Sequence, residues 1–168
     1  LVAREAALGS DHPVTLTAKE NVASTLHQLG KNNEAETMTR DVLRAREAML
    51  GSDHPDTLTA KGNLASTLHA LGKHNEAEKM TRDVLVAREA ALGSDHPDTL
   101  TAKGNLATTL HPLGKYNEAE TLERDVLQVR EATLGSDHPD TLTAKDNLAT
   151  AKGNLAITLH ALGKYSEA

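Results

Sequence analysis

The sequence predicts an all-α fold, a right-handed superhelical solenoid of antiparallel helix pairs. The first observation is a 42-residue period: residues 50–91 are identical to 92–133 at 33 of 42 positions and to 8–49 at 34 of 42. The second is that each repeat holds two runs of apolar residues at helical spacing, divided by glycine. Because a single unit of this kind leaves an apolar face uncovered, it must bury that face against its neighbours, and the core runs along the array.

The first helix of the second repeat is predicted to begin at Pro55. Proline fixes its own φ near helical values and favours an extended preceding residue, so His54 or Asp53 should be the N-cap. The apolar stripe then continues at steps of three and four to Leu71. Gly72 should end the helix, because a residue without Cβ adopts the left-handed conformation easily. We name this helix of each repeat helix A.

A second helix, helix B, is predicted after a corner at residues 72–74. Its apolar positions begin at Ala77 and recur at helical spacing as far as Leu92. Glu78 and Arg82 lie four residues apart, and we expect them to pair on the outside of the helix. Gly93 should close helix B, so that the next helix A follows after a short corner.

The chain is interpreted as one repeat array over residues 1–168. Residues 1–7 have the same sequence as 85–91, which predicts the end of a helix B. The seven residues 146–152 duplicate the neighbouring sequence, and seven residues make two helical turns, so helix A should lengthen to about 24 residues from about 17 without losing its apolar stripe. The units are 1–7, the repeats 8–49, 50–91 and 92–133, and a partial fourth repeat 134–168.

These residues carry a resemblance to a known family. The repeat resembles the tetratricopeptide repeat in its small and aliphatic positions, and the 42-residue period is similar to that of kinesin light chains and related bacterial and fungal signalling proteins. The resemblance implies a scaffold that binds other proteins. The matching features are the HPDT opening, the NLA run at 63–65, the LGK corner at 71–73, and Leu64, Ala65, Leu68, Ala77 and Pro97.

Composition excludes several functions. A net charge of −6 with no concentrated basic segment argues against nucleic acid and against anionic membranes as partners. No apolar run approaches the length of a transmembrane helix. The chain has no cysteine, which permits a reducing compartment, and we expect a cytoplasmic protein.

Nine histidines raise the question of a metal site. The two histidines of one repeat are 15 residues apart, about 22 Å along a helix, and no pair has the i, i+4 spacing of a helical metal site. We therefore expect no metal and no cofactor, and local capping instead. No phosphate loop, catalytic triad or acid–base carboxylate pair is present, so no catalytic residue is assigned. The histidines recur before helix A, at His12, His54, His96 and His138, and in its last turn, at His27, His69, His111 and His160.

Lysines also recur along helix A. They could attract an acidic peptide, or they could extend between stacked helices with the charged end in water. The sequence leaves both interpretations open. The residues are Lys19, Lys61, Lys103, Lys145 and Lys152.

The polar face of helix A is the candidate binding site. It lies opposite the leucine stripe, and in tetratricopeptide arrays this side lines the concave groove. The asparagine amides could bond the backbone of an extended peptide, as the resemblance implies, or a neighbouring helix, which would fix the stacking. The candidate residues are Asn21, Asn63, Asn105, Asn147 and Asn154, with Ser24, Ser66 and Thr108, and with Thr17, Thr59 and Thr101.

We therefore predict a non-enzymatic scaffold for peptides or extended protein segments. The alternative is a structural or sensing array within a larger signalling protein. Because repeat ends expose surfaces that fit another repeat, head-to-tail self-association is also expected.

Overall fold

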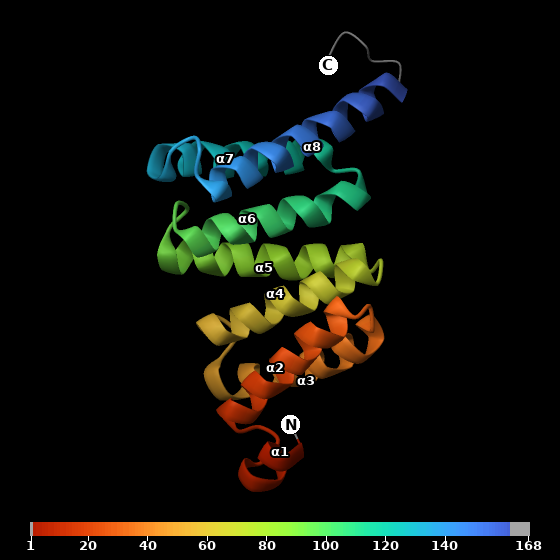
Figure 1. Ribbon diagram of the computed structural model, residues 1–168, viewed down its shortest axis with the longest axis vertical. Helices are drawn as coiled ribbons and strands as arrows, with labels where there is room; N and C mark the ends of the chain where they lie inside the picture. Colours follow the sequence, from red (N-terminus) through yellow and green to blue (C-terminus); the bar gives the residue numbers. More distant parts are fainter. Residues whose placement is uncertain (1, 162–168) are drawn as a thin grey trace. The chain divides into compact units, whose positions relative to one another are not determined.

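A computed structural model describes residues 2–161, and these fold into helices joined by short corners (Figure 1). Residues 2–161 contain no strand. Within unit 1, α1 packs on α2, α2 on α3 and α3 on α4, and within unit 2, α6 packs on α7 and α7 on α8. The all-α fold of antiparallel helix pairs is confirmed. The elements are α1 Val2–Leu8, α2 Pro13–Gln28, α3 Asn32–Leu50, α4 Pro55–Ala70, α5 His74–Leu92, α6 Pro97–Leu110, the 3-10 helix η1 His111–Leu113, α7 Tyr116–Leu134 and α8 Pro139–Ala161.

The chain divides into two compact units, each described by itself. Unit 1 covers residues 1–87 and unit 2 covers residues 88–168. Helix A corresponds to α2, α4, α6 and α8, and helix B to α3, α5 and α7. In unit 1 both α2 and α4 pack against α3, and in unit 2 both α6 and α8 pack against α7.

Histidine caps the first turn of helix A. His54 has an extended backbone, with φ −64° and ψ 140°, and its Nδ1 accepts a hydrogen bond from the Asp56 amide at 3.2 Å. This resolves the alternative left by the sequence, because His54 and not Asp53 is the cap. The capping expected from the sequence is confirmed in each helix A, at His12, His54, His96 and His138.

Glycines with positive φ mark the corners at a constant interval. Gly51, which follows α3, has φ 87°, and Gly72, which follows α4, has φ 75°. An L side chain is strained at these angles, and glycine is not. The positive-φ glycines among the described residues recur every 21 positions, at Gly9, Gly30, Gly51, Gly72, Gly93, Gly114 and Gly135.

The length of helix A differs between repeats. α2 and α4 have 16 residues, close to the expected length, but α6 stops after 14. Pro112 stands where α4 has Ala70, and because proline has no N–H it cannot continue the helical bonding. The chain forms the 3-10 turn His111–Leu113 instead, so a uniform helix A is wrong for the third repeat. α8 has 23 residues, which confirms the extension expected from the seven-residue duplication.

Leucine, alanine and valine form the core of each unit. Leu64 and Leu68 are fully buried in unit 1, and burial of a leucine side chain contributes about 2 kcal/mol. In α8 the buried positions Thr141, Ala144, Leu148 and Ala151 are three or four residues apart. The core cluster of unit 1 is Leu16, Val42, Leu43, Ala60, Leu64, Leu68 and Ala77, and that of unit 2 is Leu100, Val126 and Ala144.

Within residues 2–161, no helix combines the length and the hydropathy that a membrane span requires.

Candidate functional site

The polar residues predicted on helix A lie at the protein surface. All of them are exposed except Asn147 and Asn154, which are half-buried in α8. The hydroxyls of Thr17, Thr59 and Thr101 each donate to the carbonyl of the proline four residues earlier, at 2.9 to 3.1 Å. Thr108 donates to Gly104 in the same way. These hydroxyls therefore use their proton on their own helix and keep their oxygen available as an acceptor.

The asparagine amides behave differently from the threonine hydroxyls. The backbone carbonyls of Asn21, Asn63 and Asn105 accept bonds from threonines four residues later. Among the described residues, no hydrogen bond of their side-chain amides is found. Among the described residues, Asn147 differs, because a hydrogen bond from its amide contributes to the pKa of Glu123 on the neighbouring helix.

In unit 1, side chains of α2 and α4, the two helices A, form a small recess together with α3. Three predicted residues, Ser24, Asn63 and Ser66, lie together there. The volume is about 200 Å³, which is below the usual range of small-molecule sites. The lining residues are Glu20, Ala23, Ser24 and His27 of α2, Thr39 of α3, and Asn63, Ser66 and Thr67 of α4.

Glu20 is a residue of this recess that the sequence reasoning missed. Its Oε2 accepts a hydrogen bond from Arg46 Nη2 at 2.8 Å, whereas its Oε1 is buried without a protein partner. Burial raises the pKa of Glu20, Arg46 lowers it, and Asp56 raises it. The net result is a raised pKa, because burial penalises the charged carboxylate.

His27 is the second polar residue of the recess with a defined orientation. Its Nδ1 lies 2.8 Å from Oδ1 of Asn32. Because the amide oxygen can only accept, Nδ1 carries the proton in this bond, and Nε2 of the neutral ring is then an acceptor. His27 is therefore oriented by Asn32 at the wall of the recess.

Lys19, Lys61 and Lys145 of the helices A are held by contacts inside the protein. Lys61 Nζ lies 3.4 Å from a carboxylate oxygen of Glu47 and donates to the Ser52 carbonyl at 3.2 Å. The same two contacts recur at Lys19, with Glu5 and Ser10, and at Lys145, with Glu131 and Ser136. These contacts support the interpretation that the lysines bridge adjacent helices.

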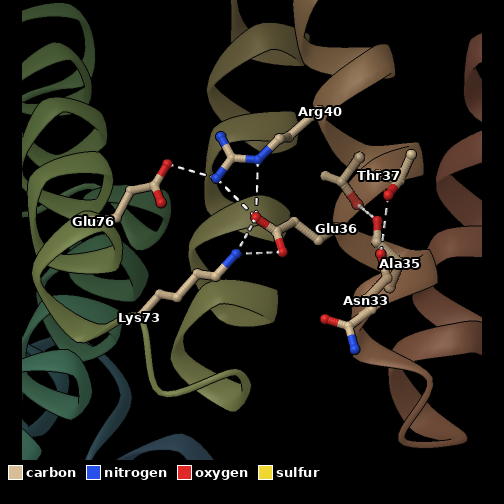
Figure 2. Close-up of polar contacts among 8 residues, drawn as sticks. Asn33, Ala35, Glu36, Thr37, Arg40, Lys73 and Glu76 are labelled. Carbon is tan, nitrogen blue, oxygen red and sulfur yellow. Dashed lines mark hydrogen bonds and ion pairs between the residues drawn. The ribbon is translucent and has the colours of Figure 1, made fainter.

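Glu36 of α3 is the centre of a charge network in unit 1 (Figure 2). Lys73 Nζ lies 2.8 Å from each oxygen of the Glu36 carboxylate, and Arg40 donates to the same group at 2.9 and 3.0 Å. Arg40 also reaches Glu76 of α5 at 2.6 Å. The hydrogen bond from Lys73 is the main cause that holds the pKa of Glu36 below its usual value, and Arg40 adds to it.

The equivalent pair in the next repeat corrects one expectation. Glu78 and Arg82 do pair, at 2.8 Å. However, only 9% of Glu78 is exposed, so the predicted location on the outside of the helix is wrong. The i, i+4 spacing brings the two side chains together but does not determine which face of the helix they occupy.

Glu123 of α7 is the most deeply buried carboxyl in the described part of the chain, with 1% of the residue exposed. It occupies the position that Thr39 and Thr81 hold in the earlier repeats. Burial raises the pKa of Glu123 to about 7, although a hydrogen bond from Asn147 and the charge of Arg130 lower it. Its Oε2 has no protein partner.

Between residues 2 and 161, no three histidine or acidic side chains lie close enough together to hold an ion.

Helix pairs in sequence, each with one polar and exposed helix face, define a helical-repeat protein. The tetratricopeptide repeat family matches residues 20–89, 56–132 and 98–153, and the chain belongs to this family. A comparison with curated proteins finds no match.

Two similar crystal structures come from Podosopora anserina, from a protein assigned as a kinesin light chain with nearly identical TPR-like repeats. One of them, a single-substitution form, has a TM-score of 0.81 and 26% identity, over 99% of this chain and 78% of that one. The other has a TM-score of 0.79 and 27% identity, over 98% and 78%. BtubC (BKLC) from P. vanneervenii shares the fold, with a TM-score of 0.74 and 18% identity over 90% of this chain and 58% of that one.

Proposed function

We propose that the chain is a non-enzymatic scaffold that binds a peptide or an extended protein segment along the exposed faces of its helices A, in a groove of the kind the family uses. Repeats of this family generally mediate interactions between proteins. The carrying observation is that the amides of Asn21, Asn63 and Asn105 are exposed and that, among the described residues, no hydrogen bond engages them. Each amide offers a donor and an acceptor, which is what a peptide backbone requires.

Panning a phage library of random dodecapeptides against the chain tests this proposal. The enriched peptides would be synthesised, and their affinities measured by fluorescence polarisation. Replacing Asn63 by Ala should weaken binding by about 2- to 10-fold, which corresponds to one lost hydrogen bond.

Asn75 supplies a matched control. It is also an exposed asparagine, but it lies on α5, a helix B. Asn75→Ala should leave the affinity unchanged. The proposal would be abandoned if the library gave no peptide above a blank surface, or if both asparagine variants weakened binding equally.

Two features of the proposal concern the cellular setting. Cytoplasmic location stays a prediction, as does a role as a structural or sensing array within a larger signalling protein. A peptide selected in the panning experiment would favour the scaffold, because a spacer needs no ligand.

Head-to-tail self-association also stays a prediction, and the Glu36 network supplies a template for it. Lys31 and Glu34 hold the positions equivalent to Lys73 and Glu76, and they pair with each other at 3.6 Å. Sedimentation at rising concentration should therefore show association that Lys31→Glu reduces, and a parent that stays monomeric throughout would exclude it.

A further inference from the structure

The recess of unit 1 contains a carboxylate that the second and third repeats lack. Glu20 stands where these repeats have Gly62 and Gly104, and the fourth repeat has Asp146 at this position. A Cβ built on either glycine would meet no atom within 4 Å, so packing does not impose glycine at this position. Glu20 therefore distinguishes the first helix A from the second and third, and it lines a recess that already contains polar predicted residues.

The charges around Glu20 sum to a negative value. Arg46 binds Glu20 at 2.8 Å through Nη2, and its Nη1 lies 3.9 Å from a carboxylate oxygen of Asp56. Two carboxylates and one guanidinium leave a net charge of −1. The buried Glu20–Arg46 pair is itself neutral, and the remaining negative charge lies on Asp56, whose side chain is 61% exposed, so its attraction for a cation at the recess is screened by salt.

The recess also contains a hydrogen-bond acceptor that has no donor within the protein. Glu20 Oε1 is buried and has no protein partner, and a buried polar atom of this kind costs about 1 to 3 kcal/mol until it is satisfied. His27 is a second polar residue of the wall, and its ring nitrogens can donate or accept according to the tautomer. A donor from a bound segment would satisfy both the charge and the unpaired oxygen.

We propose that this recess is a specificity site that receives a lysine side chain of the bound segment. The inference rests on the proposed function, because it places one residue of a peptide ligand. A volume of about 200 Å³ is several times the roughly 30 Å³ of a water molecule and below that of a typical small-molecule site, so it suits one side chain.

Lysine fits the recess better than arginine. A guanidinium binds a carboxylate best through two parallel hydrogen bonds, which need both oxygens. In Glu20 one oxygen is already occupied by Arg46, and only Oε1, which is buried, has no protein partner. An ammonium group, with three donors around a point charge, can use a single carboxylate oxygen together with His27 Nε2 and a serine hydroxyl of the wall.

The test uses the phage library of random dodecapeptides on the parent chain and on Glu20→Gln. This substitution keeps the shape of the side chain and removes its charge. Arg88 and Arg130, the equivalents of Arg46, face glycine in place of glutamate and keep their bond to the following helix A, so the fold tolerates the loss of this carboxylate. Glu34→Gln, at an exposed glutamate of α3, is the matched control.

We expect the parent and Glu34→Gln to enrich lysine at one peptide position, and Glu20→Gln to select peptides without it. Replacing that lysine by methionine in a synthetic peptide should weaken binding to the parent at least about 10-fold, which is 1.4 kcal/mol, and leave binding to Glu20→Gln almost unchanged. Selected peptides with no preferred lysine, or an equal loss in both proteins, would overturn this inference while leaving the scaffold intact. A library that yields no binder to any of the proteins would remove both proposals.

Discussion

Unit 1 and unit 2 each bury a carboxylate on a helix B, and the pKa values of the two groups move in opposite directions. Glu36 is 9% exposed and lies against Lys73 and Arg40, which hold its pKa below the usual value. Glu123 is 1% exposed, has an amide as its hydrogen-bond partner, and has its pKa raised to about 7. Burial alone therefore does not determine whether the pKa of a carboxylate rises or falls. A cation in direct contact outweighs the desolvation of Glu36, and an amide does not outweigh that of Glu123.

The largest expected effect is on the pH dependence of stability through Glu123. Its folded pKa of about 7 exceeds the ordinary 4.5, so between these values the folded state holds a proton that the unfolded state has lost. Stability should therefore fall by up to about 3 kcal/mol as the pH rises from 4.5 to 7 and then level off. Glu123→Gln should remove this slope and be more stable than the parent at pH 8.

Urea denaturation followed by circular dichroism at several pH values measures the effect. The exposed Asp83, changed to Asn, is the control, and its difference from the parent should not have this slope. A parent and a Glu123→Gln variant with parallel pH profiles would show that Glu123 is ionised in the folded protein throughout.

A smaller effect of opposite sign is expected at Glu36. Glu36→Gln leaves Lys73 and Arg40 without their shared carboxylate and should cost roughly 2 kcal/mol at pH 7, since the group is mostly but not fully buried. The lowered pKa gives stability that is present above pH 4.5 and lost as the pH falls through the folded value. The difference from the parent should therefore shrink in acid, in the same urea experiment. A cost that persists unchanged at pH 3 would indicate lost packing instead of lost charge.

The smallest expected effect is a difference in stability between alanine variants of two asparagines at equivalent positions. Asn147→Ala removes the hydrogen bond to Glu123 and should cost about 1 kcal/mol above pH 7, where that carboxylate is charged, and less below pH 5. Asn63→Ala should change stability by less than about 0.5 kcal/mol, because its amide is exposed. Thermal melts at pH 5 and pH 8 provide the comparison, and equal losses in both variants would contradict the distinction.

The repeat period and the corner residues were sufficient to predict the fold. Proline and histidine fix where helix A begins, and glycine fixes where each helix ends, and these are local conformational preferences that a sequence displays directly. The predicted helix A residues lie at the surface, as expected, and three of them line the unit 1 recess.

The features that the sequence reasoning missed are differences between repeats. Three such differences can be read in the sequence: Glu20 in place of glycine, Glu123 in place of threonine and Pro112 in place of alanine. They were overlooked because the repeats were treated as equivalent. Whether such a residue is paired depends on contacts between helices, which helical spacing does not reveal. Position-by-position comparison of the repeats would have identified all three.

The constant interval between the positive-φ glycines has a consequence for how the chain can change in length. Every corner recurs after 21 residues, and corners of the same type recur after 42. Deletion or insertion of 42 residues within the repeats at 8–133 therefore rejoins a helix to its own continuation and leaves each corner with equivalent neighbours. Recombination between near-identical repeats can thus lengthen or shorten the array without creating a new junction.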